Sequence, residues 1–245
     1  MKGRYLFVRL FLIAFGIALF SLLNQGCKKS SDTSTGGITP PPAGMVQDVD
    51  GNNYHTVTIG TQTWLVENLK VTHYRNGDAI VAGTSVNKGN AGIGQGAFWN
   101  YGNKDSLGKI YGRLYNYYAL IDSRFLAPLG WRVASNSDWN VLANFLGADS
   151  IAGGKLKESG TLHWANPNIG ATNSSGFTAL PGGNYNSVTH FFSFLGYGTS
   201  LWTSTEIDAN EAYACSIFNN SATFNHGIGM NVPKFGGLSV RCVKE

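Results

Sequence analysis

The chain has 245 residues, of which only 13% are charged, while 13% are aromatic and 32 are glycine. An average soluble protein has about 25% charged residues, so polar loops must replace many charged helix faces here. Without Lys2, Arg4 and Arg9 near the start, Lys plus Arg falls from 18 to 15 against 14 Asp plus Glu, so the formal charge falls from +4 to about +1. Only Lys28 and Lys29 then form a basic run, so no nucleic-acid partner is expected.

The first 26 residues are predicted to be a lipoprotein signal peptide. A basic start precedes an apolar run at residues 10–23, which is short for a membrane-spanning helix. Gly26 precedes Cys27, the predicted lipidation site. Asn24 stands where a strict lipobox has Leu, so the segment instead resembles the looser lipoboxes of Bacteroidetes lipoproteins.

The predicted domains are therefore the signal peptide at 1–26, the anchor and Ser/Thr/Gly/Pro linker at 27–44, and one folded domain at 45–245. The alternative is a plain signal peptide with an incidental cysteine. The lipid at Cys27 would tie the protein to a membrane in the cell envelope. We expect an outer-membrane lipoprotein, either periplasm-facing or exposed at the cell surface.

The folded part opens with a predicted β-hairpin and a further strand at residues 45–70. Asp50-Gly51 is a strong turn signal. The carboxylates of Asp48 and Asp50 could alternatively hold calcium, but the spacing does not match an EF-hand loop, which favours a turn.

Residues 76–103 are rich in Gly and Asn and are predicted to be loops. Within them Phe98, Trp99 and Tyr101 are candidate ligand-binding aromatics, able to stack on a sugar or peptide. The alternative is that they pack onto their own domain, as loop aromatics commonly do. The other five tryptophans are expected in the core: Trp64, Trp131, Trp139, Trp164 and Trp202.

The clearest helix is predicted at residues 135–147. Ser135 and Asp138 can form a capping box, apolar residues recur at helical spacing, and Gly147 ends the pattern. A Tyr-rich segment at 111–121 predicts a strand that runs into a short helix. The remaining predictions are a short helix at 153–160 and strands at 201–205, 212–219 and 238–243.

Cys215 and Cys242 are predicted to form a disulfide, because two cysteines left in an exported domain are commonly paired. The alternative is two buried free thiols. Glu67 and Asn68 lie within an apolar segment. They could be a catalytic carboxylate with its orienter, but we favour a structural role, with Arg132 and Arg241 as candidate partners.

Seven sequence blocks carry a family resemblance. They fall in the same order along the chain: WLVENLK, YGRLYNYYAL, LAPLGWRVASNSDW, GGKLKESGTLHW, ATNSSGFTALPGG, LWTSTE and GLSVRCVK. Together they resemble the Fibrobacter succinogenes major paralogous domain, except that Ala134 stands where that family often has Pro. The resemblance implies an α+β fold that is similar to C-type lectins and formylglycine-generating enzymes, with short antiparallel strands, one or two helices and long loops.

The family brings no established activity, and the two distant cysteines argue against the paired thiols of formylglycine-generating enzymes. The histidines lack metal-site spacing, and no nucleophile elbow is present. No catalytic residue, metal or cofactor is therefore predicted. We expect a surface binding or adhesion module for a glycan or protein ligand. The alternatives are a carboxylate-dependent hydrolase acting on glycans and a structural envelope protein.

Overall fold

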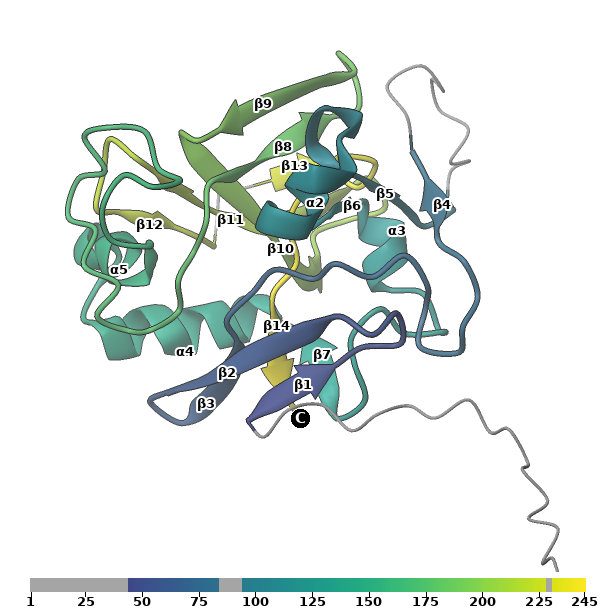
Figure 1. Ribbon diagram of the computed structural model, residues 1–245, viewed down its shortest axis with the longest axis horizontal. Helices are drawn as coiled ribbons and strands as arrows, with labels where there is room; N and C mark the ends of the chain where they lie inside the picture. Colours follow the sequence, from purple (N-terminus) through teal and green to yellow (C-terminus); the bar gives the residue numbers. More distant parts are fainter. Residues whose placement is uncertain (1–43, 84–93, 228–230) are drawn as a thin grey trace, which may run out of the picture. The chain divides into compact units, whose positions relative to one another are not determined.

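The first sheet joins the start of the folded domain to the end of the chain (Figure 1). The computed structural model describes residues 44–83, 94–227 and 231–245. All neighbours in this sheet are antiparallel, in the order β1-β2-β3-β14-β7. Its strands are β1 (Met45–Gln47), β2 (Asn53–Ile59), β3 (Gln62–Leu65), β7 (Trp131–Val133) and β14 (Cys242–Lys244).

The predicted turn between β1 and β2 is confirmed. Asp48 Oδ1 accepts hydrogen bonds from the backbone N–H groups of Asp50 and Asn52, each at 2.9 Å. Its Oδ2 accepts a bond from the Tyr54 hydroxyl at 2.6 Å. The Asp48 carboxylate thus organises the turn and fixes the first core tyrosine.

A second sheet forms the other half of the β structure, with strand order β12-β11-β10-β8-β9 and β13 paired to β11. Its strands are β8 (Gly182–Asn186), β9 (Phe191–Leu195), β10 (Gly198–Glu206), β11 (Glu211–Phe218), β12 (Phe224–Asn225) and β13 (Asn231–Pro233). A small third sheet contains β4 (Val81–Ala82), β5 (Ala97–Trp99) and β6 (Leu114–Tyr115). The fold is therefore α+β with mostly β structure.

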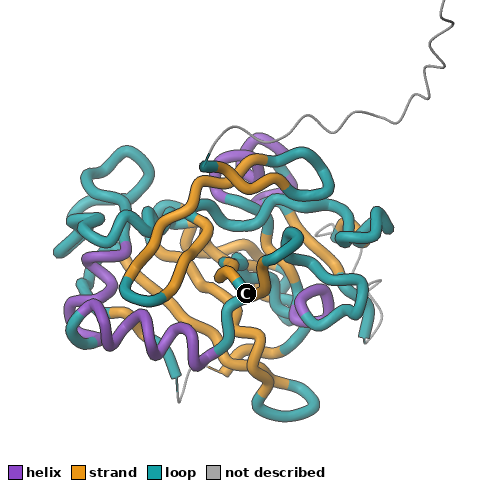
Figure 2. Tube along the Cα trace, turned by 90° about the horizontal axis from the view of Figure 1, so that it is seen from below, coloured by secondary structure: helices purple, strands orange, loops and turns teal. Residues whose placement is uncertain are grey.

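The predicted capped helix is confirmed as α4 (Asn136–Leu146). Its capping box is formed by Ser135 and Asp138, its predicted apolar face is buried, and Gly147 ends it in the left-handed region. The other helices are η1 (Tyr101–Asn103), α2 (Asp105–Tyr111), α3 (Tyr117–Leu120) and α5 (Asp149–Leu156). Figure 2 shows the helices at the periphery of the strands. In the described ranges, no helix is long and apolar enough to cross a membrane.

Other predicted elements are confirmed in part. The Tyr-rich segment is strand β6 followed by helix α3, as expected. Helix α5 begins at Asp149, four residues before the predicted start. The predicted C-terminal strand is interrupted, because Leu238 and Ser239 make isolated bridges to other strands and β14 begins only at Cys242. The predicted leader, Cys27 and residues 84–93 of the predicted loops lie outside the described residues.

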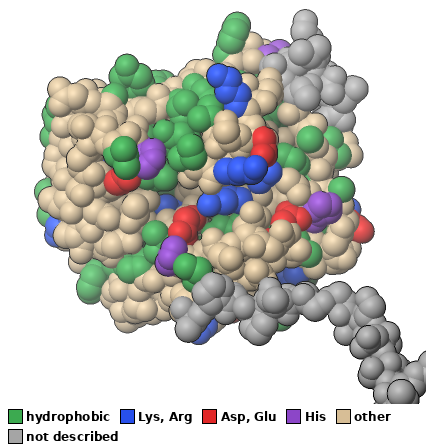
Figure 3. Space-filling model, viewed as in Figure 1, with side chains coloured by type: hydrophobic (Ala, Val, Ile, Leu, Met, Phe, Trp, Pro, Cys, Tyr) green, Lys and Arg blue, Asp and Glu red, His purple; other side chains and the backbone are tan. Residues whose placement is uncertain are grey.

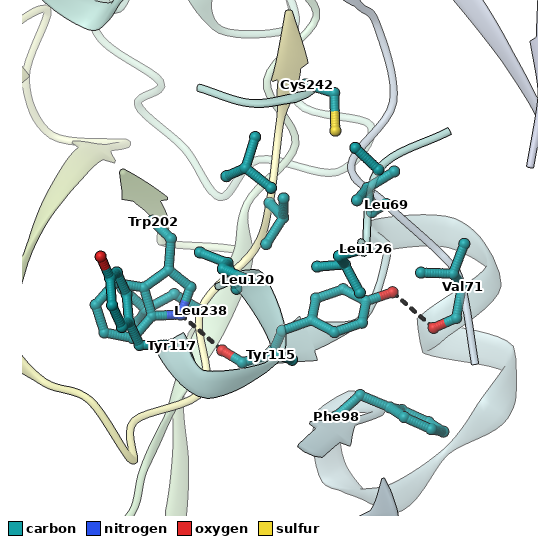
Figure 4. Packing of buried hydrophobic residues seen from close by; sticks show 14 of the residues in the cluster. Leu69, Val71, Phe98, Tyr115, Tyr117, Leu120, Leu126, Trp202, Leu238 and Cys242 are labelled. Atoms are coloured by element: carbon teal, nitrogen blue, oxygen red, sulfur yellow. Dashed lines mark hydrogen bonds between the residues drawn. The ribbon is translucent and has the colours of Figure 1, made fainter. Parts of the chain in front are cut away.

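The core contains the five tryptophans that were expected there, and all five are buried. One cluster holds Trp202 and Tyr115, whose contacts are shown in Figure 4. There the indole N–H of Trp202 donates to the Tyr115 carbonyl at 2.6 Å, and the Tyr115 hydroxyl donates to the Val71 carbonyl at 2.8 Å. These bonds satisfy the polar atoms of two large buried side chains.

The predicted disulfide was wrong, since Cys215 and Cys242 are both buried free thiols. Cys242 belongs to the Trp202 cluster, whereas Cys215 packs in a second cluster around Trp64, Trp139 and Phe177. Strand β11, which carries Cys215, is paired with β10, β12 and β13, whereas β14 is paired with β3 and β7. The two cysteines are therefore in different sheets, and pairing register could not be inferred from the sequence.

Candidate ligand-binding site

The β8–β9 hairpin presents two different faces. Asn186 pairs with Phe191, Asn184 with Ser193, and Tyr185 with Phe192. Directly paired residues project to the same side of a sheet. Asn184 and Asn186 therefore share one face with Phe191, and Tyr185 and Phe192 share the opposite face. We call these the outer face and the inner face.

The turn of this hairpin is set by local hydrogen bonds. The side-chain oxygen of Asn186 accepts bonds from the backbone N–H groups of Val188 and Thr189, at 2.9 and 3.0 Å. His190 takes a positive φ of 58° to complete the reversal. An asparagine that bonds to the backbone two and three residues later is a common way to start a turn, and here it fixes the position of Phe191.

The inner face packs onto the aromatics that the sequence singled out. Tyr185 stacks on Trp99 with ring centroids 4.6 Å apart, and Phe192 lies 5.2 Å from Tyr101. Phe98 and Trp99 are only 7% and 6% exposed, so these two residues follow the alternative of packing onto their own domain. The reason is that β5 pairs with β4 and β6. Trp99 and the half-buried Tyr101 thus pack against the inner face of the hairpin.

A small hollow of about 130 Å³ lies beside the outer-face residues Asn184 and Asn186. Its lining comes from the hairpin, from β10, β13 and from the segment before β14: Asn184, Tyr185, Asn186, Ser187, Val188, Ser200, Val232, Pro233, Gly236 and Leu238. Pockets that enclose drug-sized ligands measure roughly 300–1,000 Å³. A ligand here could therefore place only one small group in the hollow, and the rest would lie on the surface around it.

Strand β9 and the turn after it carry exposed aromatic side chains. Phe191 is 70% exposed, and Phe194 and Tyr197 are also exposed. Among the described strands, β9 pairs only with β8 and so forms one end of the sheet. Figure 1 shows β8 and β9 at the top of the domain, and Figure 3 shows hydrophobic side chains gathered in this region. Natural proteins usually protect such edges with charges, and strand β9 has none.

The outer face is also unusually poor in charge. Residues 159–205, which include both strands of the hairpin, contain no Asp, Glu, Lys or Arg. Lys234 follows the hollow residue Pro233, but its ammonium group is buried and bonds to Glu206 Oε2 at 2.9 Å and to the Asp208 carbonyl at 2.6 Å. The hollow is therefore lined by neutral amide, hydroxyl and apolar groups alone.

Histidine–carboxylate pairs occur elsewhere on the domain. Four of the five histidines contact an acid: His55 with Glu67, His73 with Asp50, His163 with Glu158, and His226 with Asp149. Such a contact orients an imidazole and can serve proton transfer or metal binding. Among the described residues, no three His, Cys, Asp or Glu side chains gather as a metal site.

The pair of His163 and Glu158 is the most enclosed of the three that use Nδ1. The Nδ1 atom of His163 lies 2.9 Å from both carboxylate oxygens of Glu158. The Tyr111 ring packs edge-on against the imidazole, with ring centroids 5.7 Å apart. Burial and the nearby Glu158 charge raise the pKa of Tyr111. The Nε2 atom of His163 is left for other partners, but within the described ranges no serine, threonine or cysteine bonds to this imidazole.

Glu67 has a structural contact, although neither expected arginine provides it. The Glu67 carboxylate accepts hydrogen bonds from the backbone N–H of His55 at 2.8 Å and from Nδ1 of the His55 ring at 2.6 Å. Arg132 instead binds Asp138, and Arg241 binds Asn68. Glu67 and Asn68 therefore serve different networks, and neither belongs to the outer face.

Sequence reasoning missed the residues of the outer face. The HFFSFL segment at 190–195 follows the turn asparagine, and the long charge-free stretch surrounds it. These two signals together could have indicated a neutral, aromatic edge strand. What they could not give is the register that places Phe191 beside Asn186.

The comparison with known families agrees with the ordered blocks in the sequence. The family model of the Fibrobacter succinogenes major domain matches residues 57–244. The chain belongs to this family. The hollow and the outer face lie within the matched residues of the Fibrobacter succinogenes major domain. No curated protein and no solved structure matches the chain.

Proposed function

We propose that this chain is an exported, lipid-anchored binding module of the cell envelope, whose ligand docks on the outer face of the β8–β9 hairpin. The single observation that carries the proposal is the position of Phe191, which is exposed at a sheet edge and paired directly with Asn186 at the rim of the hollow. An apolar contact next to oriented amides is the usual composition of a binding site.

The support beneath the hairpin favours a rigid site. The Tyr185 ring lies between Trp99 and Phe192, at 4.6 and 5.0 Å, and its hydroxyl lies 3.0 Å from His190 Nδ1. A face held by stacked rings loses little conformational entropy when a ligand binds. Rigid aromatic anchors with adaptable Asn and Ser neighbours are also typical of antibody paratopes.

The signal peptide, the lipid on Cys27 and the outer-membrane location are part of this proposal and rest on the sequence pattern at residues 1–44. The C-type-lectin-like arrangement is likewise proposed. It is supported by the last strand, β14, which pairs with β3 near the start of the domain and with β7 before the capped helix α4.

Binding by the full chain in detergent to a panel of neutral polysaccharides, anionic polysaccharides and unfolded peptides would test the function. Phe191→Ala should weaken the binding of at least one of these probes. The matched control is Phe145→Ala, which removes a 62% exposed phenylalanine on α4, at the opposite end of the domain from β9 in Figure 1. If no probe discriminates between the two variants, the outer face is not the binding site.

A second candidate function is hydrolysis, and the enclosed pair of His163 and Glu158 is the observation that favours it. An oriented imidazole could activate water, as a general base does. Release of reducing sugars from the same polysaccharides would test this function. His163→Gln should abolish the release while leaving binding unchanged; release that persists in this variant would exclude the dyad.

A further inference from the structure

We infer that the ligand of the outer face is an uncharged glycan chain, one sugar unit of which lies against Phe191. The inference rests on the proposed function and adds the chemical class of the ligand. It follows from three properties of the face: its lack of charge, its combination of ring and amide groups, and the small size of the hollow.

The lack of charge excludes ionic ligands. The ten residues that line the hollow include no Asp, Glu, Lys, Arg or His. Six of these ten residues come from a 47-residue stretch, 159–205, without any Asp, Glu, Lys or Arg, and the other four come from residues 232–238. A site for an anionic polymer or a charged peptide would carry groups of opposite charge, because these provide attraction and steering.

The polar groups that remain suit hydroxyl groups. Within the described residues, the one hydrogen bond of Asn184 Nδ2 is a long contact of 3.5 Å with Ser200 Oγ. The side-chain oxygen of Asn186 accepts the hydrogen bonds of the turn. The NH₂ group of the same side chain is therefore the part that can donate hydrogen bonds to a ligand. Amides and hydroxyls can each donate and accept hydrogen bonds, which matches the mixed donor and acceptor character of sugar hydroxyls.

The aromatic group suits the other surface of a sugar. A pyranose ring has hydroxyls around its rim and C–H groups on its face. The C–H face packs on the electron-rich face of an aromatic ring, and Phe191 offers such a ring next to Asn186. One sugar unit can therefore contact the phenyl ring and the amides at the same time. A purely apolar peptide side chain could use only the ring, and a purely polar one could use only the amides.

The size of the hollow indicates a chain that lies along the surface. About 130 Å³ accommodates one substituent or part of one ring, so the rest of a ligand must lie outside the hollow, where Phe191 is exposed at the sheet edge. A chain of sugar units could contact the hollow and Phe191 at the same time, whereas a single sugar could contact only one of them. We therefore expect oligosaccharides to bind more tightly than single sugars.

The test measures binding of the full chain in detergent to neutral glycan hexamers, namely β-1,4-glucan, α-1,4-glucan and β-1,4-mannan oligosaccharides. Polygalacturonate and an unfolded peptide serve as charged and proteinaceous comparisons. An aromatic contact of about 0.5–1.5 kcal/mol corresponds to roughly 2- to 12-fold in Kd. Phe191→Ala should weaken binding of a neutral hexamer by this factor, Phe191→Trp should preserve it, and Phe145→Ala should leave it unchanged.

Ionic strength separates the outcomes further. Binding of an uncharged glycan should not change between low and high salt, whereas binding between charged partners is screened. If only polygalacturonate or the peptide binds in a Phe191-dependent manner, the glycan inference is overturned and the proposed function stands. If no probe depends on Phe191, both are overturned.

Discussion

Asp138 belongs both to the predicted cap of helix α4 and to an ion pair with Arg132 on strand β7. Its carboxylate accepts bonds from the Ser135 backbone N–H at 2.8 Å and from Arg132, at 2.5 and 2.8 Å. Burial alone would raise the pKa of Asp138, but the hydrogen bonds from Arg132 and Ser135 outweigh it and lower the pKa to about 2. The folded state therefore strongly prefers the ionised carboxylate.

The size of this preference sets the predicted effect of Asp138→Asn. A pKa that falls from 3.8 to about 2 corresponds to roughly 2.4 kcal/mol, at about 1.36 kcal/mol for each pKa unit. Arg132 is about half exposed, and solvent screening reduces the value of such a pair. We therefore expect the substitution to lower the free energy of unfolding by about 1–2 kcal/mol at pH 7, because the new amide can still accept a bond from Ser135.

The pH dependence identifies the charge as the cause. The pKa is lower in the folded protein, so the stabilisation is fully present above the unfolded value near 4. It is lost as the pH falls through about 2. The difference in stability between wild type and Asp138→Asn should thus be constant from pH 7 to about pH 5 and should shrink below about pH 4.

Urea denaturation followed by tryptophan fluorescence, repeated between pH 7 and pH 3, measures this difference. Asp105→Asn is the matched control, since Asp105 is half exposed in its pairs with Lys109 and Arg113 and should change stability by less than about 0.5 kcal/mol. Parallel stability curves for wild type and Asp138→Asn across the whole pH range would refute the reasoning.

Three further predictions concern other parts of the chain. Arg241 donates to the carbonyls of Leu65 and Phe177, both at 2.9 Å, so Arg241→Met should cost about 3 kcal/mol or more in urea denaturation; a loss below 1 kcal/mol would contradict this role. Burial raises the pKa of both Cys215 and Cys242, so without reductant both thiols should resist alkylation when folded and react when denatured; a requirement for reductant would reveal a disulfide. Palmitate should label wild type but not Cys27→Ser, and equal labelling would exclude lipidation at Cys27.

Local sequence patterns determined the elements that depend on short-range interactions. Helix α4 follows from a serine cap, an aspartate three residues later and apolar side chains at helical spacing, all within one segment. The turn organised by Asp48 likewise depends on neighbours in the chain. The family could also be recognised, because its blocks keep their order in the linear sequence.

Tertiary structure alone decided which aromatics are exposed and whether the cysteines meet. Trp99 stands next to Gly- and Asn-rich sequence, yet β4 and β6 pair with its strand and Tyr185 stacks on it. Phe191 stands in an apolar run, yet it lies at the edge of a sheet and remains exposed. Burial of a strand residue depends on which strands become its neighbours and in what register. Those neighbours are distant in the sequence, so the local pattern determined the helix cap and the turn but not which residues form the outer face.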